Sequence, residues 1–257
     1  MISPQAIVST KAIIGKNVTI EPFAIIKDDV TIGDNTIIHS HAIIYPDSKI
    51  GNDCQIFPGA IIGIVSQDLK YKGEKATTII GNNTIIREYV TVHKGTADRM
   101  TTKIGDNCLI MAYGHVAHDC LIGNNVILAN SVGLSGHVTI EDYAIIEGFT
   151  GIQQFSVVGA HSFIAAFSII RKNIPPFIRV AREPSQYIGV NTVGLTRRGF
   201  DKETIRQIED IYRLIFVRGL NTTNAFEAIE KEIPNNEITK QIVSFIKNSK
   251  DGIVKGI

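Results

Sequence analysis

The feature that most constrains how this chain can fold is a six-residue period of branched aliphatic side chains. Every sixth residue from Ile2 to Ile62 is isoleucine or valine, and the same phase runs from Ile104 to Ile170 with isoleucine, valine or leucine. Neither an α-helix nor a simple alternating strand repeats at this interval. Such a chain can bury its aliphatic side chains by winding into a triangular prism, in which each hexad forms one short strand and one turn.

Three hexads would complete one coil of the prism, so residues 18 positions apart should lie above one another. Neighbouring coils would pair as parallel strands about 4.8 Å apart, and each coil would bury the core of the next. A small side chain often occurs four residues after the aliphatic one, and all three cysteines, Cys54, Cys108 and Cys120, occupy this inward position. We therefore expect the cysteines to pack in the core, and they match no disulfide or metal pattern.

The repeat is interrupted at residues 63–78 and 97–103, and loops that leave a regular scaffold commonly carry function. After the last hexads the pattern changes twice. We predict a β-helix domain over residues 1–178, an arginine-rich link over 179–200 and a helical domain over 201–257, where apolar residues recur at helical spacing.

Composition argues against several classes of function. The net charge of +1 gives no overall attraction to nucleic acid or to an anionic membrane. No apolar stretch is long enough for a transmembrane helix, and the N-terminal residues lack the pattern of a signal peptide. Because the cysteines form no recognisable framework, the sequence favours a reducing, cytoplasmic setting.

The coil arithmetic predicts where polar side chains converge. His118, Gly136 and Gln154 are spaced 18 residues apart and should form one column, and Asp119 and His137 should begin the column beside it. A lone surface histidine is usually a solvated side chain, but several polar groups on one column indicate a functional site.

The repeat resembles that of the hexapeptide-repeat acyltransferases, whose coils are left-handed and which, by analogy, indicate a homotrimer. The resemblance implies a mainly β fold class, a left-handed parallel β-helix followed by a small α-helical C-terminal domain. Six segments are more specific and together are similar to the UDP-N-acetylglucosamine O-acyltransferases of lipid A synthesis. These segments are SQDLKYKGE (66–74), VTVHKGT (90–96), HVAHDCLIGN (115–124), LANSVGLSGHV (128–138), QQFSVVGAHSF (153–163) and IGVNTVGLTRRGF (188–200).

This resemblance implies a cytoplasmic enzyme that moves a 3-hydroxyacyl group from acyl carrier protein to the 3-hydroxyl of UDP-N-acetylglucosamine, with active sites between subunits and without a cofactor or metal ion. A sugar hydroxyl needs a general base near pH 7, and histidine has a suitable pKa. We expect direct attack on the thioester, with His118 as the base, Asp119 as its electrostatic support and the N–H of Gly136 as donor to the oxyanion.

The same resemblance implies which residues bind the substrates. Contacts to the sugar, its nearby phosphate and other parts of the substrates are implied for Asp68, Lys70, His93, His115, His137 and Gln154. Paired arginines suit phosphate oxygens, and the nucleotide-diphosphate positions are Asn191, Arg197 and Arg198. The end of the acyl groove falls at Ala165 and Ala166.

Some positions depart from the family's pattern. Gln153 stands where the family often has histidine, Val193 where it often has an acidic residue, and Pro184 where some members have a histidine that caps the acyl groove. Ala165 and Ala166 replace glycine, so the acyl chain length stays open. Local basic residues are candidates for docking the acidic carrier protein: Arg171, Lys172, Arg179 and Arg182.

Three other interpretations compete with this one. The nearest is an N-acyltransferase of the same superfamily that acts on an amino-sugar nucleotide. A second is a zinc-dependent hydratase like the β-helical carbonic anhydrases, with His93, His115 and His118 as ligands, although the spacing of the last two does not match that family. The third is a trimeric scaffold without catalytic activity.

Overall fold

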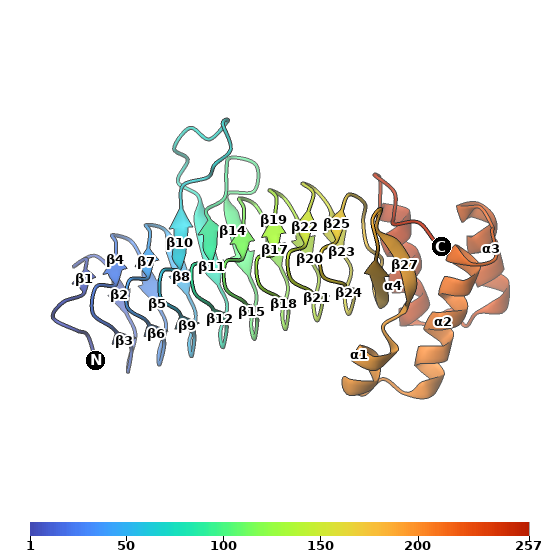
Figure 1. Cartoon of the computed structure of the whole chain (residues 1–257), viewed down its shortest axis with the longest axis horizontal. Coiled ribbons are helices and arrows are strands. Elements are labelled where there is room, and N and C mark those ends of the chain that lie inside the picture. The colour runs from blue at the N-terminus through green and yellow to red at the C-terminus, as the bar shows by residue number, and fades with distance from the viewer. Residues whose placement is uncertain (257) are drawn as a thin grey trace.

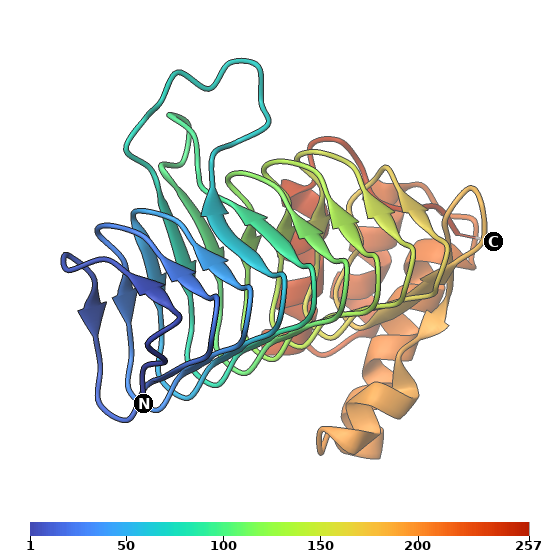
Figure 2. The same cartoon turned by 60° about the vertical axis from the view of Figure 1, so that its left-hand side comes forward.

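The computed structural model describes residues 1–256 and consists of a long prism of short strands followed by a cluster of helices (Figures 1 and 2). The N-terminus lies at one end of the prism, and the helices cover the other end. One long loop rises from the prism about a third of the way along it (Figure 2). The predicted fold class, a left-handed parallel β-helix with a small α-helical C-terminal domain, is confirmed.

Three parallel sheets form the sides of the prism, because each coil contributes one strand to each sheet. Sheet I contains β1 (Ile7–Val8), β4 (Ile25–Ile26), β7 (Ile43–Ile44), β10 (Ile61–Ile64), β13 (Thr91–His93), β16 (His115–Val116), β19 (Gly133–Leu134), β22 (Gly151–Ile152) and β25 (Ile169–Ile170). Sheet II contains β2 (Ile13–Ile14), β5 (Thr31–Ile32), β8 (Ser48–Ile50), β11 (Thr77–Ile80), β14 (Thr101–Ile104), β17 (Leu121–Ile122), β20 (Thr139–Ile140) and β23 (Val157–Val158).

Sheet III completes the prism and continues into an antiparallel hairpin at its C-terminal end. It contains β3 (Thr19–Ile20), β6 (Ile37–Ile38), β9 (Gln55–Ile56), β12 (Ile85–Ile86), β15 (Leu109–Ile110), β18 (Ile127–Leu128), β21 (Ile145–Ile146), β24 (Phe163–Ile164), β26 (Ile178–Ala181) and β27 (Gln186–Val190). We name the corners of the prism by the sheets that they join: corner I/II, corner II/III and corner III/I.

The aliphatic residues of the six-residue period form the core, as predicted. Val116, Leu134 and Ile152 are paired in register on successive coils of sheet I and are buried. The three cysteines are free and buried on the small inward position. Because every coil closes the interior of the next, the long stack of coils holds its outward side chains at fixed heights.

Both interruptions of the repeat lie on the same side of the prism. The first loop joins β10 to β11, and the second joins β13 to β14. Both therefore leave the prism at corner I/II.

The segment 179–200, predicted as a link, is ordered into β26, β27 and the short helix α1 (Thr192–Arg197). Three longer helices follow: α2 (Lys202–Phe216), α3 (Thr222–Glu232) and α4 (Glu237–Asn248). Asp201 caps α2 by accepting a hydrogen bond from the N–H of Thr204. Within residues 1–256, no helix has the length and apolar character that crossing a bilayer requires.

Candidate active site

The predicted column lies on corner I/II. His118, Gly136 and Gln154 follow β16, β19 and β22, so three successive coils place them one above another. The imidazole of His118 lies directly over Gly136, where an added Cβ would lie 2.5 Å from Nε2. Only glycine leaves room for this ring. The N–H of Gly136 has no hydrogen-bond partner among residues 1–256.

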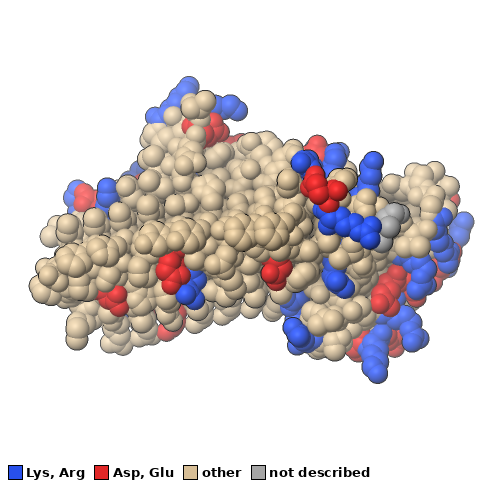
Figure 3. Space-filling view, viewed as in Figure 1, with Lys and Arg blue, Asp and Glu red and all other residues tan. Residues whose placement is uncertain are grey.

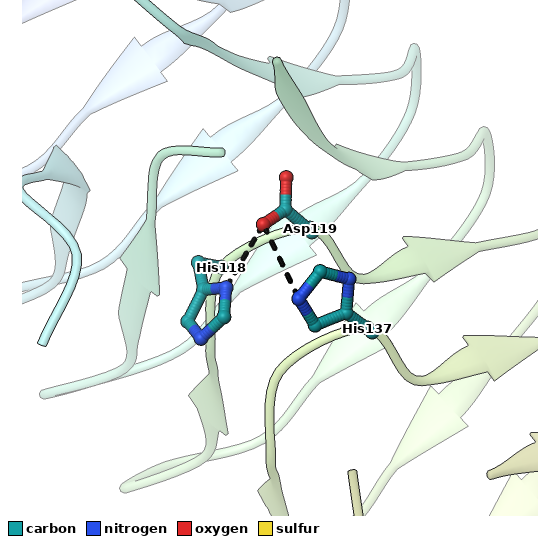
Figure 4. Close-up of side chains that lie close together, drawn as sticks. All are labelled: His118, Asp119 and His137. Atoms are coloured by element: carbon teal, nitrogen blue, oxygen red, sulfur yellow. Dashed lines mark hydrogen bonds and ion pairs between the residues drawn. The ribbon is translucent and has the colours of Figure 1, made fainter. Parts of the chain in front are cut away.

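Asp119 fixes the orientation of His118. It is the turn residue of the corner, with φ of 59°, and its side chain is fully buried beside the imidazole (Figure 4). Nδ1 of His118 lies 2.9 Å from Oδ2 of Asp119. Burial alone would raise the pKa of Asp119, but hydrogen bonds from Thr96 and His118 outweigh it and hold the pKa below its usual value. An ionised carboxylate only accepts, so Nδ1 of His118 is the donor in this hydrogen bond, and in the neutral imidazole the lone pair is on Nε2.

Nε2 of His118 faces an open hollow of about 500 Å³. The first loop covers part of this hollow and brings Oδ2 of Asp68 to 3.7 Å from Nε2. The predicted residues that line the hollow are Asp68, Lys70, His115, His118 and Gln154. A free basic nitrogen at the wall of an accessible hollow is the arrangement that a general base requires.

His137 lies one coil above Asp119 in the second predicted column. Its ring meets that of His118 edge to face, with 5.0 Å between centroids, and stacks on Phe155 at 4.7 Å. Nε2 of His137 is 3.7 Å from Oδ2 of Asp119, and Nδ1 is 3.3 Å from Asp98. Burial lowers the pKa of His137 more than these carboxylates raise it. The ring therefore borders the site as a neutral group that can exchange hydrogen bonds.

His93 and His115 extend the cluster toward the N-terminal coils. Their rings meet edge to face at 5.0 Å, and Nδ1 of His115 is 2.8 Å from Oγ1 of Thr91. Burial, aided by the charges of His115 and His118, lowers the pKa of His93 to about 4, and burial also lowers the pKa of His115. Both imidazoles are therefore uncharged near pH 7.

The three histidines of the zinc interpretation do not converge on one point. Among residues 1–256, the one group of at least three donor side chains with mutually close ligand atoms consists of His118, Asp119 and His137. Both oxygens of Asp119 already accept hydrogen bonds from residues of the second loop. The geometry therefore favours acid–base chemistry over metal chemistry at this corner.

Comparison with known proteins identifies the family. A family model described as UDP-N-acetylglucosamine O-acyltransferase, domain 2, matches residues 173–254, and one described as bacterial transferase hexapeptide matches 11–46 and 101–136. The acyl-[acyl-carrier-protein]–UDP-N-acetylglucosamine O-acyltransferase of Sulfurihydrogenibium sp. is 56% identical over 98% of this chain and 93% of its own length. The UDP-N-acetylglucosamine acyltransferase of Bacteroides fragilis superposes with a TM-score of 0.98 at 47% identity, over 99% of this chain and 100% of that structure.

This chain belongs to the UDP-N-acetylglucosamine O-acyltransferase family. The protein of Campylobacter jejuni in the same family has 36% identity and a TM-score of 0.94, covering 100% of both chains. The similarity therefore includes the helical domain as well as the β-helix.

The residues predicted to bind the nucleotide lie elsewhere in the subunit. Asn191 caps α1 and donates from Nδ2 to the carbonyl of His161 at 2.9 Å, while Arg198 donates to the carbonyl of Tyr143 at 2.8 Å. His161 and Tyr143 form corner II/III, so one subunit does not bring Asn191 and Arg198 to His118. Arg197 is exposed in the last turn of α1.

Ala165 and Ala166 are also separate from corner I/II, because they follow β24 and so lie at corner III/I. Arg171 and Lys172, two of the residues proposed to dock the carrier protein, follow β25 and lie at the C-terminal end of corner I/II. Arg171 pairs with Glu183 at 2.6 Å and Lys172 donates to the carbonyl of Asp251.

Sequence reasoning missed the contribution of the second loop. Thr96 and Arg99 donate to Asp119, and Asp98 approaches His137, although none of the three was predicted as a site residue. The interruption lengthens its coil, so that Thr91 pairs with His115 at a spacing of 24 residues instead of 18. The position of Thr96 at the end of the VTVHKGT motif was the available signal.

Proposed function

We propose that this chain transfers a 3-hydroxyacyl group from acyl carrier protein to the 3-hydroxyl of UDP-N-acetylglucosamine, with His118 as general base. The names of the related enzymes support both substrates. The observation that carries the mechanism is the pairing of two free groups at one corner. Nε2 of His118, fixed by Asp119, lies at the wall of the hollow, and the N–H of Gly136, unpaired among residues 1–256, belongs to the residue directly beneath the imidazole.

The reaction then proceeds by direct attack. Nε2 of His118 takes the proton of the sugar hydroxyl as the oxygen bonds to the thioester carbonyl carbon, and Asp119 stabilises the imidazolium that forms. The oxyanion of the tetrahedral intermediate accepts a hydrogen bond from the N–H of Gly136. The carbon–sulfur bond then breaks, and the departing thiolate receives the proton from Nε2 as the ester forms.

A covalent route through cysteine is disfavoured by the environment of Cys120, the thiol adjacent to the dyad in sequence. Burial raises the pKa of Cys120 to about 12, and Sγ contacts the carbonyl of Ser135 at 3.2 Å inside the prism. A thiol so placed is neither ionised near pH 7 nor reachable by a substrate in the hollow.

The outer surface of the prism supports a homotrimer. Exposed aromatic residues form a ladder along corner III/I, and two stacked pairs within it, Tyr89–Tyr113 and Phe149–Phe167, have centroid distances of 5.3 and 5.1 Å. The outward residues of sheet III beside this ladder are mostly apolar: Ile37, Ile85, Leu109, Ile127, Ile145 and Phe163. Sheet II instead presents Lys49 and Lys103. Charged residues are sparse on the face of the β-helix seen in Figure 3 and gather on the helical domain.

Burial of corner III/I at a threefold axis would complete the site. Sheet I of one subunit would then face sheet III of the next, so corner I/II of the first would meet corner II/III of its neighbour. Arg198 contacts Tyr143 and His161, whose coils are those of Gly136 and Gln154. The nucleotide-binding arginines of one subunit would therefore lie beside the catalytic column of another, at the same height along the prism.

The N-acyltransferase remains the second candidate, because a general base at this corner would serve an amine as well as a hydroxyl. The deciding experiment is mass spectrometry of the products formed from UDP-N-acetylglucosamine and its 3-amino analogue with a mixture of acyl-carrier thioesters, in the presence of a chelator. We expect an ester of UDP-N-acetylglucosamine as the main product. An amide product alone would support the second candidate, and activity that the chelator abolishes would support the zinc interpretation. We expect the enzyme in the cytoplasm, where carrier thioesters are made.

A further inference from the structure

The second loop of the prism closes over the carboxylate of Asp119. Between β13 and β14, Thr96 and Arg99 approach Asp119, which is fully buried. The N–H of Thr96 donates to Oδ1 at 3.0 Å, and the N–H of Arg99 donates to the same oxygen at 3.2 Å. The guanidinium of Arg99 donates to the backbone carbonyl of Asp119 at 2.8 Å, which ties the loop to the corner.

The side chain of Thr96 makes the most informative of these contacts. Its Oγ1 donates to Oδ2 of Asp119 at 2.6 Å, and Oδ2 is also the oxygen that accepts from Nδ1 of His118 at 2.9 Å. One carboxylate oxygen is therefore held between a hydroxyl and the catalytic imidazole. Oδ1 accepts from two backbone N–H groups of the loop. The hydroxyl of Thr96 is the one side-chain group of the loop that donates a hydrogen bond to Oδ2.

The loop is built to keep this hydroxyl in place. The N–H of Met100 donates to the carbonyl of Thr96 at 2.7 Å, which closes a turn around Thr96. A side chain at Gly95 would collide with the backbone of Thr101, so glycine is needed for the loop to turn back onto the prism. Thr96 itself is buried, with 9% of its surface exposed.

We infer that Thr96 is a positioning residue for the acyl transfer, which acts through Asp119 to hold the imidazole of His118 with Nε2 toward the hollow. This inference rests on the proposed function and extends the His118–Asp119 pair to a chain of three groups. The hydroxyl keeps Oδ2 ionised and directed at Nδ1, so that the ring cannot rotate or adopt the other tautomer.

The test compares Thr96→Val, which removes the hydroxyl at nearly constant volume, with Thr96→Ser, which keeps it. Thr101→Val is the matched control, because Thr101 lies at the base of the same loop and pairs with the hydroxyl of Thr77 instead of Asp119. We expect Thr96→Val to lower kcat about tenfold or more, as for loss of a hydrogen bond to a charged group, with KM nearly unchanged. Thr96→Ser should restore most of kcat, and Thr101→Val should resemble the wild type.

The pH profile separates positioning from a general loss of structure. In Thr96→Val, Asp119 loses a donor that lowers its pKa, so activity on the acid side should fall at a higher pH than in the wild type. If the wild type is active and Thr96→Val has the same kcat and the same pH profile, the inference about Thr96 is wrong and the proposed function still stands. An inactive wild type would instead remove the proposed function.

A measurement on the wild type keeps the inference testable if Thr96→Val does not fold. Nitrogen-15 NMR of the imidazoles in the unmodified enzyme should show His118 with its proton on Nδ1 and that proton in a strong hydrogen bond. A proton on Nε2 of His118 would contradict the inference, because the chain from Thr96 through Asp119 would then not orient the ring.

Discussion

The N-terminal coils and the coils between residues 104 and 170 share one interior but differ at corner I/II. Both direct an aliphatic side chain inward at every sixth position, and in the N-terminal coils these side chains are buried from Ile20 onward. At the N-terminal part of the corner, Lys11 and Asp28 form an exposed pair at 2.9 Å. At the later part, His118, Asp119 and His137 form a buried cluster.

The difference shows that the winding specifies the scaffold and leaves the corner residues free to vary. Chemistry arises where the two loops fold back over the corner. Asp68 comes from the first loop, and Thr96 from the connection between β13 and β14, at the point where the regular hexads stop. The regular coils supply fixed heights, and the loops add side chains that contact the residues held there.

The largest expected effect comes from removing the proposed general base at the later part of corner I/II. His118→Ala should lower kcat by about 10²–10⁴-fold, because the general base is lost, while the trimer and its melting temperature persist. Lys11→Ala is the control at the equivalent corner of an N-terminal coil and should leave kcat unchanged. Steady-state kinetics and sedimentation of both variants provide the test. A His118→Ala enzyme with wild-type turnover would mean that the corner is not the catalytic site.

The second prediction concerns the free energy of unfolding at acid pH, which should depend on His93, in the coils that carry the candidate site. The pKa of His93 in the folded protein is about 4, against 6.5 for an unperturbed histidine, because of burial. Between these values the unfolded chain binds more protons, so stability falls as pH drops from about 6.5 to 4 and levels off below that. In the wild type this titration should lower the free energy of unfolding by about 3 kcal/mol between pH 6.5 and 4, and His93→Gln should abolish that decrease. Denaturant unfolding at pH 7 and pH 4.5 measures it, and an equal acid loss in the variant would refute it.

Gly136 tests how closely the column is packed. Gly136→Ala should lower kcat by about 10²-fold, because the added Cβ would displace the imidazole of His118 from above the oxyanion donor. Gly151→Ala is a structural control, since an added Cβ there meets nothing within 4 Å, and it should keep the wild-type melting temperature. Kinetics and thermal melting of the pair separate displacement of the ring from loss of the fold. Wild-type kcat in Gly136→Ala would show that the ring tolerates the shift.

A smaller effect tests whether the neighbouring subunit completes the site. Arg198→Ala should raise KM for UDP-N-acetylglucosamine about tenfold with a lesser change in kcat, as for loss of one charged hydrogen bond to phosphate. The readout is initial rate against nucleotide concentration. Mixed trimers of His118→Ala and Arg198→Ala should contain some sites with both native residues. Failure of mixing to recover any low-KM activity would contradict a site between subunits.

The sequence predicts the regular part of this molecule well, because a period of six leaves one way to bury the aliphatic side chains. The column of His118, Gly136 and Gln154 follows from the same arithmetic. Thr96 and Arg99 could not be found in this way, because the interruption adds residues whose path no period specifies. The separation of Arg198 from His118 was also hidden, since it depends on which corner the end of the chain reaches.

The most direct measurement is a structure of the proposed trimer with its acylated product bound. We expect the ester oxygen, which was the sugar 3-hydroxyl, within hydrogen-bond distance of Nε2 of His118. We also expect the ester carbonyl toward the N–H of Gly136, and Arg198 of the partner subunit near the diphosphate. A product bound along another corner of the prism, or with its ester remote from His118, would contradict this expectation.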